Sequence, residues 1–402
     1  MSTITASPSE RQEGFSLNKL IRANIQTYAL IGAMVIIWVF FSWQTKGAYL
    51  GAQNFSNLFR QMTITALLSV GMVLVIVTGN IDLSVGKLAG FVSVVVAYLQ
   101  ARVWTSATFA GMPEAVTTIL AILAGLAVGT LAGVIQGYII AYFRVPAFIV
   151  TLAGLWIFNG LILIVTEGKT IPANQPLFSQ ISQGYLPKEV GWILAAIVVA
   201  ALFFTMFTGR QKKQRYGFEL PPIALDLVKT IVLSLVVVGY VAMVNQYNGV
   251  QLPVLLLAIV ALIVSYMSTN TRFGRYAYAI GGNREAARLS GVSIRKNIFS
   301  VFVLMGFLCG VSGTALASYV GYGTTAAGAG YELDAIAACI LGGTSTLGGE
   351  GTIFGAMVGA LIMASLTNGL QMMNVQPAWQ YLLKGLVLVV AVYADVQLKK
   401  NR

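Results

Sequence analysis

Apolar stretches of membrane-spanning length alternate with short polar segments along almost the whole of this chain. A helix needs about 20 apolar residues to cross the hydrocarbon core of a bilayer. Twelve segments fit or approach that length, at 27–44, 61–79, 84–103, 115–142, 147–166, 191–208, 224–245, 251–268, 298–320, 332–343, 353–371 and 378–396. The pattern predicts an all-α, polytopic integral membrane protein with about 12 membrane-embedded helices, in which the segment 332–343 is too short to span unaided.

One polar interruption, residues 270–297, contains the signals of a complete short helix. Asn283 is a favourable N-cap, Glu285 lies in the first turn, Arg288 lies in the last turn, and Gly291 can adopt the left-handed conformation that ends a helix. These signals predict a helix of about seven residues, roughly 10 Å long. A helix this short needs a surface to dock against.

The basic residues predict which way the chain is inserted. The interruption holds six of them against the single acid Glu285, namely Arg272, Arg275, Arg284, Arg288, Arg295 and Lys296. Cytoplasmic loops of membrane proteins are enriched in Lys and Arg. Counting 332–343 as a crossing places both termini and the loops 209–222 and 269–297 inside, with 167–191 outside. The expected layout is a tail 1–25, one transmembrane domain 26–397 and a tail 398–402, both tails cytoplasmic.

Composition agrees with this class and narrows the chemistry. Hydrophobic residues make up 57% of the chain and charged residues 9%, far from the balance of soluble domains. The net charge of +12 lies in loops between apolar segments, so we expect membrane lipid and no nucleic acid as a partner. Histidine is absent, which excludes histidine general bases, Ser-His triads and the commonest metal ligand. Cys309 and Cys339 lie in apolar runs, where we expect buried small side chains and no disulfide or metal pair. No Gly-x-x-x-x-Gly-Lys-Ser/Thr loop occurs, so we expect no enzyme activity and no bound cofactor.

Two glycine-rich segments, 79–86 and 342–351, interrupt the apolar pattern. Non-helical backbone at membrane depth persists only where protein or water satisfies its polar groups, so such breaks often line a transport pathway. Asp82 in the first break has two interpretations. Its carboxylate could cap the next helix, or it could contact cargo.

Polar side chains within apolar segments are the other candidates for a pathway, because each would be costly against lipid. Lys384 is expected in an interior or aqueous position for this reason. The candidate pathway residues are Asn80, Asp82, Ser84, Trp156, Asn159, Asn368 and Gln380. The competing interpretation is that Trp156 belongs to an interfacial belt and that the amides hold helices together.

Four segments, 79–86, 145–154, 279–292 and 332–349, resemble the permease subunits of bacterial ABC importers for monosaccharides, in particular the xylose type within the ribose/xylose/galactose family. The resemblance covers about residues 45–396. It implies a ribose-permease-like core of ten helices with a two-helix insert at about 186–246. It also implies an inner-membrane location, alternating access and a cargo such as D-xylose or a related pentose or hexose.

The same resemblance implies the partners. These are a cytoplasmic ABC ATPase that binds ATP and Mg, a periplasmic sugar-binding protein and a second permease copy, forming a homodimer. The residues expected to couple to the ATPase are Asn283, Arg284, Glu285, Ala286, Ala287, Arg288, Leu289, Ser290 and Gly291. Arg284 and Arg288 share one helical face, while Ala286 and Leu289 can share another.

Two alternatives remain open at this stage. An ion-coupled secondary transporter would need ionisable residues within the membrane, for which Asp82, Lys229, Asp334 and Lys384 are the candidates. An ABC permease of the same fold could instead carry a nucleoside, a branched-chain amino acid or a signalling furanose. Many members of the family have a glycine or an acid at the position of Asn80. Because of this difference, the first break does not identify the cargo.

Overall fold

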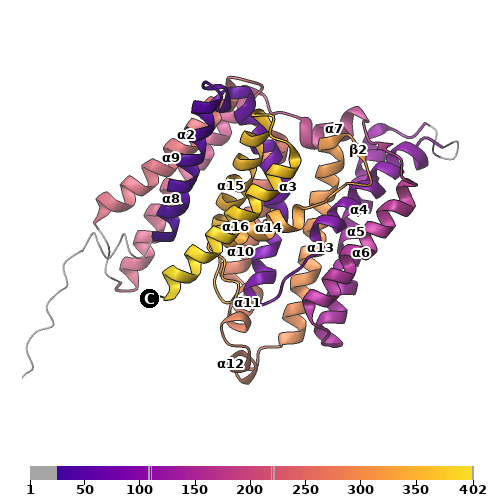
Figure 1. The fold of residues 1–402 in the computed structure, drawn as a ribbon. Coiled ribbons are helices and arrows are strands. Elements are labelled where there is room, and N and C mark those ends of the chain that lie inside the picture. The colour runs from indigo at the N-terminus through magenta and orange to yellow at the C-terminus, as the bar shows by residue number, and fades with distance from the viewer. Residues whose placement is uncertain (1–24, 107–108, 110, 219, 221, 401–402) are drawn as a thin grey trace, which may run out of the picture.

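The chain folds into a bundle of helices that run between two ends of the molecule (Figure 1). The computed structural model describes residues 25–106, 109, 111–218, 220 and 222–400. The predicted tail 1–25 lies outside this range except for its last residue. Of the predicted tail 398–402, residues 398–400 continue the final helix.

The described elements are almost entirely helical. The α-helices are α2 (Ile25–Gln44), α3 (Ala52–Val77), α4 (Val85–Tyr98), α5 (Glu114–Tyr142), α6 (Ala147–Thr166), α7 (Pro176–Gln183), α8 (Lys188–Arg215), α9 (Ile223–Asn245), α10 (Leu252–Asn270), α11 (Arg272–Gly282), α12 (Arg284–Leu289), α13 (Ile294–Val320), α14 (Tyr331–Leu341), α15 (Ile353–Met372) and α16 (Pro377–Lys400). A 3₁₀ turn, η1 (Ala48–Leu50), follows α2, and a π-helical segment, η2 (Leu99–Val103), extends α4. Two short strands, β1 (Ile171–Pro172) and β2 (Tyr322–Gly323), pair antiparallel.

The predicted fold class is confirmed. Among the described residues, nine helices are long and apolar enough to cross a membrane, and two more, 30–44 and 377–390, are apolar over shorter ranges. Together with α14 they correspond one to one to the predicted segments. At 11 residues, about 16 Å, α14 is too short to cross a bilayer unaided, as the sequence predicts.

The core is formed around α3, whose residues are mostly buried from Leu58 to Val77. Beside it α5 and α13 pack backbone against backbone. A methyl group added at Gly129 of α5 would lie 2.5 Å from the carbonyl oxygen of Gly306 on α13. A methyl group added at Gly306 would lie similarly close to the carbonyl oxygen of Gly129. Small residues at such crossings let membrane helices approach each other closely.

The helices α8 and α9 form a hairpin at the edge of the bundle, over the segment predicted as a two-helix insert (Figure 1). They pack on each other, and a small cluster that includes Phe55, Ala195 and Val244 joins them to α3. The Gln251 side chain, directly before α10, accepts from the Tyr240 hydroxyl of α9 (2.6 Å) and donates to the Ser56 hydroxyl of α3 (2.7 Å), so it links α9 to α3. Most of the hairpin surface is exposed, as expected of helices that face lipid.

The two ends of the bundle differ (Figure 1). The helix α7 and the strand β2 lie at one end, where β1 joins the segment after α6 to the segment after α13. The helices α11 and α12 lie at the other end. The polar loop 270–297 is therefore a folded helical structure.

Candidate coupling helix and polar grooves

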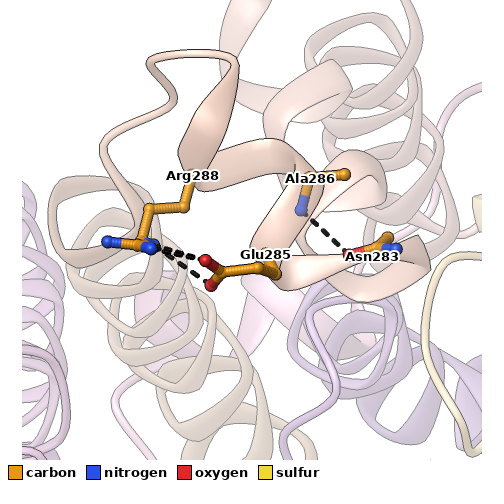
Figure 2. Close-up of polar contacts among 4 residues, drawn as sticks. All are labelled: Asn283, Glu285, Ala286 and Arg288. Atoms are coloured by element: carbon orange, nitrogen blue, oxygen red, sulfur yellow. Dashed lines mark hydrogen bonds and ion pairs between the residues drawn. The ribbon is translucent and has the colours of Figure 1, made fainter.

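The helix α12 has the geometry that its sequence predicts. The Asn283 side chain accepts a hydrogen bond from the Ala286 backbone N–H at 2.9 Å, which is a regular N-cap (Figure 2). At the other end Gly291 has φ +81°. Its N–H donates to the Arg288 carbonyl, and the Val292 N–H donates to the Ala287 carbonyl, both at 3.0 Å. These two bonds form a Schellman motif, so both ends of the helix are closed by local contacts.

The outward surface of α12 combines charge with one large apolar side chain. All nine residues predicted for coupling are described, and each is exposed except Ala287. Leu289 is 76% exposed. Arg288 forms an ion pair with Glu285 one turn earlier (Figure 2), and this bond raises the pKa of the Arg288 guanidinium above its ordinary value. The helix packs against α11 and α13, Ala287 is its buried residue, and its other side chains lie at the surface.

The helix α11 connects this surface to the interior. Its N-cap is Thr271, its buried face includes Ala277 and Ile280, and the Asn297 side chain donates to the Phe273 carbonyl at 2.9 Å. Gly281 lies so close to the bundle that an added methyl group would be 1.7 Å from the Val77 carbonyl oxygen. The end of α11 is therefore pressed against the end of α3.

Both glycine-rich breaks meet at this point. The Gly349 N–H, in the second break, donates to the Val77 carbonyl at 2.9 Å, just before the first break. The Tyr278 hydroxyl of α11 donates to the Gly351 carbonyl at 2.7 Å, and burial raises the pKa of this hydroxyl. One short helix thus contacts the second break and the end of α3, directly before the first break.

Within the first break, Asp82 and Ser84 form a buried polar cluster. One Asp82 oxygen accepts from the Ser84 N–H (2.8 Å) and from the Ser84 hydroxyl (2.7 Å). The Gln136 amide of α5 donates to the same hydroxyl at 3.0 Å. The Asp82 carboxylate is therefore held beside Ser84, the N-cap residue of α4, and Asp82 is 2% exposed.

A groove near α12 contains another predicted pathway residue, Asn80. The groove has a volume of about 860 Å³ and lies between the first break, the α5–α6 connection, α12 and the start of α13. We call it the basic groove because its charged lining residues are Arg144, Arg284, Arg288 and Arg295. Asn80 thus lies beside the coupling helix.

The remaining pathway candidates lie apart from one another. Trp156, on α6, is 68% exposed, and Asn159 is half-buried on the same helix. Asn368 is buried on α15, where its amide exchanges hydrogen bonds with Asn54 (2.9 and 3.1 Å) and donates to Gln61 (3.3 Å). This amide cluster ties α15 to α3.

Gln380 lies in a second groove, at the opposite end from α12. This groove, of about 640 Å³, lies between α14, the end of α15 and the start of α16. We call it the polar groove; its polar lining residues are Tyr331, Asp334, Thr367, Gln371, Asn374, Gln376, Gln380, Tyr381 and Lys384. Within it, the Lys384 ammonium contacts an Asp334 carboxylate oxygen at 2.9 Å. Lys384 is therefore paired within the protein, as its cost in lipid predicts.

Several residues at these sites were not identified from the sequence. Tyr278 and Gly281 belong to an amphipathic helix whose buried positions follow the helical period, a signal that could have located them. Gln136 and Arg144 give no such signal, because only the fold brings them to the first break and to α12.

A bundle of membrane-length helices, with two non-helical breaks and a short exposed helix at one end, is the architecture of a multi-pass membrane protein. The profile of a protein family described as "Branched-chain amino acid transport system / permease component" matches residues 54–392. The chain belongs to this family of transport permeases.

Individual relatives match over nearly the whole chain. The xylose transport system permease protein XylH of Escherichia coli K12 is 43% identical over 96% of this chain and 95% of its own length. XylH of Haemophilus influenzae is 41% identical over 95% of this chain and 99% of its own length. The ribose import permease protein RbsC of Escherichia coli K12 is 33% identical over 85% of each chain. No solved structure matches the chain.

Proposed function

We propose that this chain is the transmembrane subunit of an ABC importer that carries a monosaccharide, D-xylose or a related pentose or hexose, across the inner membrane. Its relatives XylH and RbsC are permeases named for xylose and ribose. The energy comes from ATP hydrolysis on separate ABC ATPase subunits, which bind ATP and Mg²⁺. The permease itself catalyses no covalent change.

The α12 end of the bundle faces the cytoplasm in this proposal. Arg144, the basic residues of α11 to α13 and the basic last turn of α8 are all expected on this side by the positive-inside rule. The polar groove then faces the periplasm, where a sugar-binding protein delivers its cargo. Both termini are cytoplasmic in this orientation.

The contact between α11 and both breaks is the observation that supports coupling best. A partner that engages Leu289 and Arg288 moves α12, which follows α11 after the single extended residue Asn283. Through Gly281 and Tyr278 the displacement reaches Val77 and the second break. An exposed short helix with one apolar anchor is suited to a groove on a partner protein.

The two breaks separate helices that can tilt relative to each other. Movement at their junction would change the access of the pathway from outward to inward, which is alternating access. A second permease copy completes the pathway, and the binding protein supplies sugar at the periplasmic end.

The test is a double substitution, Arg288→Asp with Leu289→Asp, in the complete importer. The expected result is at least a tenfold loss of ATP-dependent uptake of labelled D-xylose, with normal amounts of permease in the membrane. Gln214→Asp, which places a carboxylate at an exposed position of α8, is the matched control and should keep uptake within twofold of wild type. Uptake at the wild-type rate by the double variant contradicts the assignment of α12.

An ATPase-inactive partner distinguishes the importer from an ion-coupled secondary transporter. The ABC mechanism predicts that inactivating the ATPase stops uptake while the proton and sodium gradients are intact. Continued accumulation that collapses with an ionophore would favour ion coupling instead. The pairing of Asp334 with Lys384 gives each charge a partner within the protein, which weakens the case for their use as ion-coupling groups.

A further inference from the structure

Contact between the polar groove and lipid chains would be unfavourable. Nine of its thirteen lining residues have polar side chains, and it opens to the surface of a single copy between α14 and α16. In a membrane-embedded protein, polar surface of this kind faces water or other protein. The groove is therefore not a lipid contact.

The ion pair strengthens this argument. Lys384 Nζ lies 2.9 and 3.2 Å from the two Asp334 oxygens, and the side chains are 15% and 19% exposed. A lysine within the hydrocarbon layer is unfavourable unless protein or water satisfies its charge. Further along the same helix Leu386 and Val389 are 54% and 66% exposed, so α16 also has an apolar surface.

The chemistry of the groove fits a neutral polyhydroxylated ligand. Its two charges satisfy each other, so an ionic cargo finds no unpaired counter-charge among the described lining residues. Gln371 and Gln380 supply amide donors and acceptors, and Tyr331 and Tyr381 supply rings and hydroxyls. The Gln380 amide is fixed by its bond to the Val375 carbonyl at 2.8 Å. A volume of about 640 Å³ is in the range of small-molecule sites, about 300–1,000 Å³.

We infer that the polar groove is the wall of the sugar pathway at the end opposite α12, where Gln371 and Gln380 meet the hydroxyl groups of the passing sugar. The Asp334–Lys384 pair holds α14 against α16 and keeps this wall polar without a net charge. This inference rests on the proposed function and adds the residues that contact the cargo.

Cysteine accessibility tests the inference directly. The natural cysteines Cys309 and Cys339 are both buried, so the chain itself offers a low background of reactive thiols. Gln380→Cys is treated with a charged, membrane-impermeant thiosulfonate in the complete importer. Leu386→Cys, on the apolar surface of the same helix, is the matched control.

We expect Gln380→Cys to react at least tenfold faster than Leu386→Cys, and labelling to block the uptake of radioactive D-xylose. The sugar-loaded binding protein with ATP should slow the labelling. Equal labelling of the two variants, or full uptake after complete labelling at position 380, overturns the inference.

Charge exchange tests the ion pair separately. Asp334→Asn and Lys384→Met should each lower D-xylose uptake at least tenfold while ATP hydrolysis by the complex continues. The exchanged pair, Asp334→Lys with Lys384→Asp, should recover at least a third of the wild-type rate. Wild-type uptake by both single variants contradicts the role of the pair, and if the single variants fail to reach the membrane, the cysteine experiment decides.

A failure of the inference differs from a failure of the proposed function. If the wild-type complex imports D-xylose but position 380 is unreactive, the groove is not the pathway. If the wild-type complex imports no monosaccharide, the proposed function itself fails.

Discussion

Gly349 donates its backbone N–H to the backbone carbonyl of Val77 at 2.9 Å, so the second interruption is hydrogen-bonded to the end of α3, directly before the first interruption. Gly281 of α11 covers this bond, with no space for a side chain. In the proposed mechanism, a displacement of α12 reaches the interior at this junction of three segments.

A methyl group at position 281 should disturb this junction. Gly281→Ala would place a carbon 1.7 Å from the Val77 oxygen, so α11 must shift. Overpacking of this kind costs about 1–3 kcal/mol, and we expect roughly a tenfold loss of sugar uptake. Gly282→Ala is the control, since an added methyl group at 282 meets nothing within 4 Å. Equal uptake by the two variants would show that the close packing at Gly281 is not needed for coupling.

Loss of the Asn283 cap should loosen α12 locally. The Asn283→Ala variant removes the acceptor of the Ala286 N–H, at a cost of about 1 kcal/mol. Amide hydrogen exchange in α12 should become about fivefold faster. The Asn283→Ser variant keeps an acceptor and should exchange at nearly the wild-type rate. Unchanged exchange in the alanine variant would mean that packing, rather than the cap, holds the helix.

The Tyr278 hydroxyl should stabilise the second break. Tyr278→Phe leaves the Gly351 carbonyl without this donor, and a bond of this kind contributes about 0.5–1.5 kcal/mol. Limited proteolysis or hydrogen exchange should show residues 342–352 opening more often. Tyr276→Phe, two residues away and more exposed, is the matched control and should change nothing. Identical exchange in both variants would show that the Tyr278 hydroxyl does not stabilise the second break.

The close packing of α5 and α13 should make one glycine far more sensitive than another. Gly129→Ala forces the helices apart, and we expect a loss of about 1–3 kcal/mol, seen as a lower thermal midpoint in detergent. Gly160→Ala on α6 meets nothing within 4 Å and should be neutral or stabilising, because alanine favours helix by about 1 kcal/mol. A higher midpoint for the 129 variant contradicts the packing argument.

Local signals explain why α12 could be predicted residue by residue. Its cap, its ion pair and its terminal glycine all act within a few residues, so the sequence contains every partner. Hydropathy likewise locates the membrane helices, although some extend into polar sequence beyond the apolar segment, as α8 does on both sides of 191–208.

The rest depends on contacts between distant segments. Both breaks were recognised by their glycines, but their meeting with Gly281 is set by the fold of the whole bundle. The partner of Lys384 lies 50 residues away, although the cost of the lysine itself was predictable. The helices α7 and α11 were missed because short amphipathic stretches within polar loops give weak signals. Their buried residues, such as Phe178 and Ile280, can be identified only when the surface of the bundle against which they pack is known.

The α8–α9 hairpin has a mechanical consequence for the importer. At 28 residues α8 is about 42 Å long, whereas the hydrocarbon core is about 30 Å thick. Its basic last turn, with Lys212, Lys213 and Arg215, must therefore project into the headgroup layer. Anchored in this way, the hairpin fixes the depth of the protein in the bilayer, and with it the height at which α12 stands above the membrane surface.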